Sequence, residues 1–313
     1  MINALSKSAT RTGAVLSLAV GLFCLFSPSG LGQTLYGGLG GHNNGDSTND
    51  GALATVNPNT AAVSIVGHPA GVTRISGLAF DGSGVLYGST LRPGGGFPPP
   101  SGPRISDLIR INPGTGATLT SVPITSGAQS LSIADLTIQP GTGNLYGITS
   151  PDGDTAPGQL YVINKLTGIA TLIGNTGYFF GSIAFAPTGV LFMSAANLNF
   201  ATGAMIDQAL KTIDPNTGAT LTSVATRDFF GAFAVRSDGT IFGGTGDEHQ
   251  LYTIDRVTGA ETLIGDTGSN FIGALAFQPV PENGATFGLM ALSLLGLIAL
   301  SQALTLRKVA AVT

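Results

Sequence analysis

The acidic and histidine side chains of this 313-residue sequence gather in polar segments between short apolar runs. Carboxylates and imidazoles bind divalent metals and transfer protons, so these segments are where chemistry would take place. A ring of such groups on one surface would bind a divalent cation, and oxygen ligands would favour calcium over zinc. The alternative is that exposed loops are polar because they are solvated. The candidates are His42, His68, Asp152, Asp154, Asp247, Glu248 and His249.

One of these segments, DSTNDG at residues 46–51, has the spacing of a calcium loop. Asp46, Thr48 and Asp50 stand at alternate positions and a glycine follows them. The twelfth position is Asn57 where a calcium loop has glutamate, and Asn57 is also a turn residue of the repeat described below. A turn rich in Asp and Asn is therefore the alternative to a Ca²⁺ site. No other cofactor is predicted.

The sequence contains none of the motifs G-x-S-x-G and H-E-x-x-H, and no phosphate-binding glycine loop. Asp214 and Asp255 occupy a place in the repeat that holds Asn57 in another copy, so we interpret them as turn residues. A glycosidase would need two unlike carboxylates close together at one site. We therefore expect no catalytic residues, with a secreted hydrolase or lyase as the alternative.

The elements that must position these segments form a unit that occurs five times. Its first part reads LYTIDRVTGAETLIG at residues 251–265, and its second part reads ISGLAFDGSGVLYGST at residues 75–90. Apolar residues alternate in four short segments of each copy, which predicts four antiparallel strands. In the T-G turns the preceding Asp or Asn accepts backbone hydrogen bonds, and the glycine takes a positive φ.

A four-stranded sheet cannot bury both faces alone, and stacking such sheets around an axis produces a β-propeller. The last copy lacks its fourth strand, and QTLYGGLGG at residues 33–41 matches that strand in the other copies. We therefore predict an all-β, five-bladed propeller of four-stranded antiparallel blades at residues 33–279, closed by the N-terminal strand. An open arc or an additional degenerate blade is the alternative.

Propeller topology places the uniform T-G and P-x-G turns on one face and the variable inserts on the other. Variable loops on a rigid scaffold usually carry recognition. The inserts are residues 42–52, 91–107, 151–159, 197–209 and 246–250. Aromatic side chains before the third strand of the unit would offer a stacking surface for sugars, or alternatively fill the space between blades. They are Tyr178, Phe179, Phe180, Phe229, Phe230 and Phe271.

The pattern LY-x-I-[DN]-x-x-T-G-x-x-T-x-I-G resembles the repeats of secreted bacterial propellers related to the NHL, WD40-like and quinoprotein-like families. The resemblance covers residues 35–279 and implies the architecture. It implies no particular activity, because this fold carries many.

The start of the chain has the pattern of an export signal. Lys7 and Arg11 precede an apolar stretch at residues 13–26 that is too short to span a membrane, and small residues follow it. We predict a signal peptide at residues 1–32, whose removal takes away Cys24, the single cysteine. Residues 33–279 contain 16 acidic and nine basic residues, which argues against nucleic acid as a partner.

The end of the chain has the pattern of a membrane-held sorting signal. Residues 285–306 are uncharged and long enough for a transmembrane helix, and Arg307 and Lys308 follow, which places the C-terminus on the cytoplasmic side. The order of motif, apolar span and basic end resembles the PEP-CTERM class, especially its VPDSG variant. The motif is Val280, Pro281, Glu282, Asn283 and Gly284, of which the last two depart from the usual residues.

The PEP-CTERM resemblance implies processing of the 280–313 tail by an exosortase-type enzyme in a Gram-negative bacterium that makes exopolysaccharide. We expect an exported propeller that passes through the inner membrane to the outer surface or extracellular matrix. Its expected partners are the export machinery, signal peptidase, the exosortase-type enzyme and an exopolysaccharide or other surface component. The expected role is non-enzymatic binding through the face that carries the variable inserts.

Overall fold

The computed structural model describes residues 32–40, 48–92, 104–153, 155–246, 248–268 and 270–280. The regular elements in these ranges are all β-strands, and none of the described residues form a helix that could cross a membrane. The strands belong to one compact unit, Gln33–Pro279. The predicted signal segment up to residue 31, the apolar segment 285–306, the motif residues 281–284, Arg307 and Lys308 all lie outside the described ranges.

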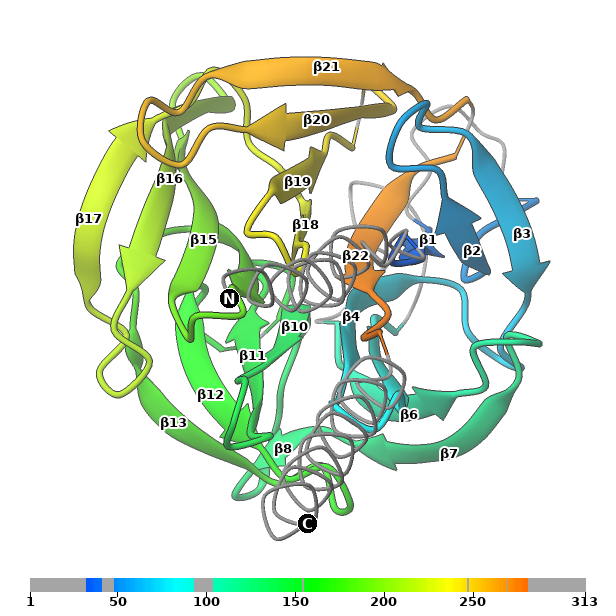
Figure 1. Ribbon diagram of the computed structural model, residues 1–313. Helices are drawn as coiled ribbons and strands as arrows, with labels where there is room; N and C mark the ends of the chain where they lie inside the picture. The colour runs from blue at the N-terminus through cyan, green and yellow to red at the C-terminus, as the bar shows by residue number, and fades with distance from the viewer. Residues whose placement is uncertain are drawn as a thin grey trace, which may run out of the picture. The chain divides into compact units, whose positions relative to one another are not determined.

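Five four-stranded antiparallel sheets surround a central axis, each with one strand at the axis and one at the rim (Figure 1). From the axis outward, blade 1 contains β22 (Ile272–Phe277), β1 (Leu35–Leu39), β2 (Leu53–Val56) and β3 (Val63–Gly67). Blade 2 contains β4 (Ile75–Phe80), β5 (Leu86–Thr90), β6 (Asp107–Ile111) and β7 (Thr118–Pro123). Blade 3 contains β10 (Ile133–Ile138), β11 (Leu145–Thr149), β12 (Gln159–Ile163) and β13 (Ala170–Asn175).

Blade 4 contains β14 (Phe180–Phe185), β15 (Leu191–Asn199), β16 (Ala204–Ile213) and β17 (Thr220–Ala225). Blade 5 contains β18 (Ala232–Val235), β19 (Ile241–Gly244), β20 (Gln250–Ile254) and β21 (Glu261–Asp266). A small ribbon of β8 (Thr125–Ser126) and β9 (Gln129–Ser130) lies between blades 2 and 3 in the chain. The predicted all-β, five-bladed architecture is confirmed.

The ring is closed by the N-terminal strand, as predicted. In β1, Leu35 pairs with Phe277 of β22 on one side and with Val56 of β2 on the other. Blade 1 therefore joins three strands from the start of the chain to one strand from its end. Strand pairing across this joint completes the fifth sheet, so β22 and the edge of β2 that faces it are not left without β1 between them.

The prediction that the four strands of each sequence repeat form one sheet is wrong, because the boundary between blades falls in the middle of the repeat. The first two strands of a repeat form the outer half of one blade, and the last two form the inner half of the next blade. Thus β5 pairs with β6 across the long insert, whereas the chain passes between blades after β7. The periodicity is the same for every cyclic permutation of a repeat, so it cannot show where a blade begins. The loop faces are unaffected, because both kinds of connection lie at the same end of the strands.

Aromatic pairs explain why the repeat has L-Y or L-F in one strand and A-F in another. Tyr36 of blade 1 packs edge to face on Phe80 of blade 2, with ring centroids 5.2 Å apart. Tyr146 of blade 3 and Phe185 of blade 4 repeat this arrangement at 5.2 Å. Such edge-to-face pairs contribute stabilisation beyond the area they bury. Phe242 of blade 5 and Phe277 of blade 1 form a third pair at 5.1 Å, so the aromatic positions of the repeat join blades at three of the five junctions.

The rim strands run around the outside of the ring (Figure 1), and the end of each one meets the T-G turn of the next blade. A Cβ built on Gly259 in the turn of blade 5 would lie 2.2 Å from the carbonyl oxygen of Ala225, which ends β17. The same close approach occurs between Gly168 and Pro123, blades 3 and 2. The turn glycine thus combines a positive φ, 72° at Gly259, with close contact to the neighbouring blade; in blade 1 the corresponding residue is Ala61, which also has a positive φ, 63°.

Candidate functional site

A cavity of about 350 Å³ opens at the axis on the face that carries the inserts. Its wall is built from the starts of the inner strands and from the loops beside them. Three aromatic rings line it, those of Phe180, Phe229 and Phe271. Its charged lining residues are Arg74, Asp152, Asp228 and Glu248.

The predicted aromatic residues divide between two roles. Phe230 is 1% exposed and packs on Tyr252 at 5.8 Å between ring centroids, so it fills space inside the blade structure. Phe180 and Phe229 line the cavity, with their centroids 5.7 Å apart. The space-filling interpretation therefore holds for Phe230, and the sugar-stacking interpretation of Phe180 and Phe229 stays a prediction.

A run of rings leads from the cavity to the surface. Phe179 packs edge to face on Phe180 at 4.9 Å and on Phe200 at 5.3 Å, and the side chain of Phe200 is 78% exposed. Phe200 lies in the turn that joins β15 to β16, the two longest strands of the molecule's described part. The predicted insert at residues 197–209 is thus an extension of this hairpin. Its residues Met205 and Gln208 line the cavity.

Arg74 lies just before β4 and brings a positive charge to the cavity wall. Its Cζ atom is 5.8 Å from the ring centroid of Phe271. Its Nε atom is buried and has no hydrogen-bond partner in the structure, and its guanidinium forms no ion pair with another described residue. Burial lowers the pKa of Arg74; Asp152 and Asp50 oppose this effect and Arg104 adds to it.

Asp152, one of the sequence candidates, lies at the cavity and is held by a second arginine. Arg104 is only 3% exposed, and its Nη1 atom is 3.1 Å from Oδ2 of Asp152. The backbone N–H of Arg104 also donates to the carbonyl oxygen of Asp152, at 2.9 Å. The two inserts of blades 2 and 3 are thereby fastened to each other beside the cavity.

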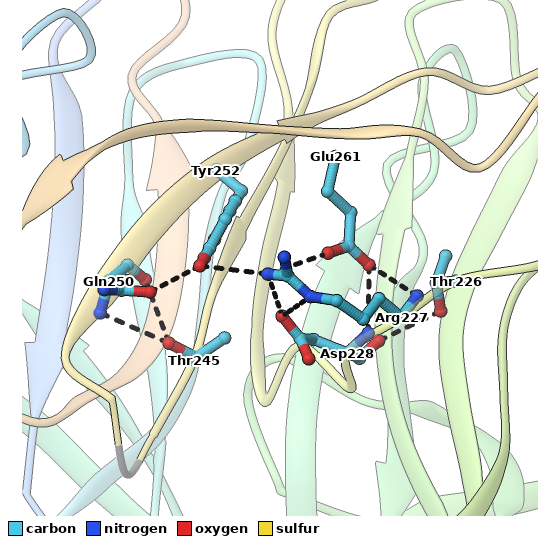
Figure 2. Close-up of polar contacts among 7 residues, drawn as sticks. All are labelled: Thr226, Arg227, Asp228, Thr245, Gln250, Tyr252 and Glu261. Atoms are coloured by element: carbon cyan, nitrogen blue, oxygen red, sulfur yellow. Dashed lines mark hydrogen bonds and ion pairs between the residues drawn. The ribbon is translucent and has the colours of Figure 1, made fainter.

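Asp228 is held by a polar network between blades 4 and 5 (Figure 2). Nε of Arg227 donates to Oδ2 of Asp228 at 3.0 Å, and its Nη2 atom donates to the hydroxyl of Tyr252 at 3.2 Å. Glu261 accepts the backbone N–H groups of Arg227 and Asp228, at 2.9 and 3.0 Å. The hydrogen bonds that Arg227 donates to Asp228 and Tyr252 are the main causes that raise its pKa. The outer end of the network continues from Tyr252 to Gln250.

The other predicted candidates are not all brought together. Glu248 lines the cavity and is exposed, but His68 is exposed on a loop that does not line it. His249 has a positive φ of 53°, its carbonyl oxygen accepts from Thr267, and its Nδ1 atom is buried without a partner. Four candidates lie outside the described ranges: His42, Asp46, Asp154 and Asp247.

Within the ranges that the structure covers, no three His, Cys, Asp or Glu side chains are close enough to hold a metal ion. Thr48 and Asp50 lie in a turn that ends at Gly51, whose φ is 75°. Because Asp46 is not described, the calcium loop at Asp46, Thr48 and Asp50 stays a prediction.

Sequence reasoning missed a buried carboxyl group in β10. Asp135 is 0% exposed; it accepts hydrogen bonds from Ser182 at 2.5 Å and from the N–H of Ile183 at 2.9 Å, both in β14. Burial raises its pKa well above the ordinary value, against these bonds, which lower it. Other copies of the repeat have a small residue here, such as Gly77, and that contrast was the available signal.

Below the cavity, a space of about 100 Å³ lies between the inner strands. Residues of these strands line it, Phe80, Phe185 and Phe277 among them, and polar atoms make up most of its exposed lining. None of the described lining residues is ionisable. Asp135 points away from this space toward β14. The axis therefore presents charged groups on the insert face, and uncharged groups deeper in the ring.

No protein-family model matches the chain, and no curated protein matches it. The chain is similar to a solved structure described as a nidogen/laminin complex, with 12% sequence identity and a TM-score of 0.48 over 80% of this chain and 99% of that chain. It is also similar to a protein of unknown function from Bacteroides caccae, with 13% identity and a TM-score of 0.42 over 79% and 99% of the two chains.

Proposed function

We propose that this chain is an exported, non-enzymatic propeller that binds a polysaccharide of the cell surface or matrix through its insert face. The observation that carries the proposal is the aromatic lining of the cavity and its continuation to Phe200. Binding sites for small molecules and sugar units are concave and largely apolar, with a few polar groups that orient the ligand. Successive rings about 5 Å apart suit an extended chain of flat units that pack on aromatic faces.

The state of the carboxylates supports binding rather than hydrolysis. Asp152 is paired with Arg104, and Asp228 is paired with Arg227. The oxygen atoms of both carboxylates are thereby engaged by guanidinium groups of the protein, whereas glycoside hydrolysis requires a general acid beside a nucleophile or base. Glycoside hydrolysis needs one carboxyl of each kind facing the same bond. The alternative of a secreted hydrolase or lyase would be supported by release of shorter products from a bound glycan.

Export and sorting rest on the two ends of the sequence. The last inner strand, β22, ends at Phe277, and Val280 of the sorting motif is exposed two residues after Gln278. A recognition motif directly after the closed ring would be accessible to a processing enzyme. Localisation of tagged protein with and without Val280–Thr313 tests this part: we expect the truncated form to be absent from the outer surface, and equal distribution of both forms would refute sorting.

A glycan-binding screen tests the binding role. We expect Phe229→Ala to weaken binding of any glycan that the protein retains, because it removes one cavity wall and the ring contact to Phe180. Leu166→Ala is the matched control, since Leu166 is 80% exposed in a turn on the opposite face. Equal affinity of the two variants would place the glycan elsewhere, and absence of binding to every glycan would overturn the proposal.

A further inference from the structure

We infer that the cavity binds a sugar unit that carries a carboxylate, and that Arg74 is the residue that pairs with this group. The inference rests on the proposed function and names the class of glycan: an acidic polysaccharide built with uronic acid units. The observation behind it is a cation in the cavity wall that the described protein leaves unpaired.

The three arginines near the cavity differ in their partners. Arg104 pairs with Asp152 and Arg227 pairs with Asp228 and Glu261. Arg74 is partly buried and lies over the face of Phe271 at 5.8 Å; Asp152 and Asp50 attract it, but neither forms an ion pair with it and its Nε atom has no partner among the described residues. Withdrawing a cation from water without a partner costs free energy, and an anionic ligand group would restore the lost interaction.

The surroundings of Arg74 favour a singly charged group on a ring. A guanidinium binds a carboxylate through two parallel hydrogen bonds, and the aromatic residues beside it would contact the rest of the sugar. Phosphate and sulfate also bind arginine in this way. However, a phosphate with two charges would need a second cation. The other cation that acts on Arg74 is Arg104, which is already paired with Asp152, and the carboxylates of Asp152 and Asp50 also act on Arg74. This balance of charges suits a ligand group with a single negative charge.

Burial also weakens the proton affinity of Arg74, which is the electrostatic sign of an incompletely compensated cation. The remaining acidic group of the cavity wall, Glu248, is exposed to solvent. Solvent screens its effect on a ligand more strongly than it screens a group inside the cavity. The cavity wall therefore repels an anion less strongly than its number of acidic residues suggests.

The experiment measures binding of the full exported chain to oligogalacturonides by calorimetry. The comparison ligand is the same oligosaccharide with its carboxyl groups methyl-esterified, which removes the charge and keeps the sugar rings. We expect the free acid to bind at least about tenfold more tightly, the usual size of a charge-assisted hydrogen bond. Arg74→Gln should remove this difference, and Arg74→Lys should retain part of it. Arg236→Gln on the turn face, where Arg236 pairs with Asp238, should change nothing.

Equal binding of acid and ester by the unchanged protein would overturn the carboxylate inference and leave glycan binding intact. Absence of binding to these and to all neutral glycans would overturn the proposed function as well. Acetate and galacturonate monosaccharide provide the last comparison: acetate binding as strong as that of galacturonate would mean a simple anion site and would refute recognition of a sugar acid. The acid and ester comparison needs no variant, so it holds even if Arg74→Gln does not fold.

Discussion

Substitution of one turn glycine tests whether the T-G turns hold the blades together. Gly259→Ala places a methyl group where the blade 5 turn meets the end of β17 in blade 4. The built Cβ lies 2.2 Å from the carbonyl oxygen of Ala225 and 2.9 Å from a methyl group of Val224. The first of these neighbours is backbone, so it cannot rotate away and one of the two blades must shift.

The expected loss has two parts that can be separated. An alanine at a φ of 72° costs about 1–2 kcal/mol, of which the lower entropy of the unfolded chain returns about 0.4–1 kcal/mol. Forcing an extra methyl into a filled contact costs about 1–3 kcal/mol. Gly259→Ala should therefore lower the free energy of unfolding by about 2–4 kcal/mol.

Gly239→Ala is the matched control, because Gly239 has a φ of 86° and no atom within 4 Å of its built Cβ. It carries the backbone cost without the blade contact, and should lose about 1 kcal/mol or less. Urea unfolding followed by circular dichroism measures both variants at constant pH. If Gly259→Ala is no more destabilising than Gly239→Ala, the contact with Ala225 does not stabilise the ring and our explanation of the T-G turn is refuted.

Two further predictions concern buried and partly buried carboxyl groups. Burial raises the pKa of Asp135 in the folded protein, so as the pH rises the unfolded chain loses this proton first. The free energy of unfolding should therefore fall by about 1.4 kcal/mol per pH unit from about pH 4 up to the folded pKa. Asp135→Asn should abolish this slope in urea unfolding measured between about pH 4 and 8, and an unchanged slope would mean that other groups cause it. Glu261 accepts hydrogen bonds from two backbone N–H groups. Glu261→Ala should therefore lower the free energy of unfolding by about 1–2 kcal/mol, and Glu261→Gln, which keeps an acceptor oxygen, should lower it less. Equal thermal unfolding of the two variants would contradict this prediction.

The fold was accessible from the sequence because its signals are local and occur repeatedly. Alternating apolar residues in every copy, and T-G turns in four of the five copies, indicate strands and their connections. The match between residues 33–41 and the missing strand predicted closure, which the pairing of β1 with β22 confirms. The phase of the blades was not accessible, because it depends on which neighbour a strand pairs with across a connection. Sequence spacing alone does not distinguish β5–β6 pairing from separation of these strands by a blade boundary.

The candidate site was accessible only in part, for a different reason. The aromatic positions repeat, so Phe180, Phe229 and Phe271 could be picked out before their arrangement was known. Arg74 does not belong to a repeated pattern and precedes an inner strand whose direction follows only from the closed ring. Its importance depends on the absence of a partner within the described structure, and that is a property of three-dimensional packing.

An acidic body and a site for an acidic glycan are compatible because the two charges act over different distances. The excess of acids over bases in the propeller repels a polyanion at long range, but salt screens exposed charges beyond about 8 Å under physiological conditions. Arg74 acts at contact distance from a wall that excludes part of the solvent, where screening is weaker and hydrogen bonds to a charged group are stronger. In the proposed complex the cavity therefore selects for the carboxylate, and the aromatic run to Phe200 supplies the contact area for neighbouring sugar units. The net negative charge of the propeller disfavours anions that do not also contact the aromatic rings. In the proposed complex, specificity therefore depends on Arg74 together with the aromatic side chains.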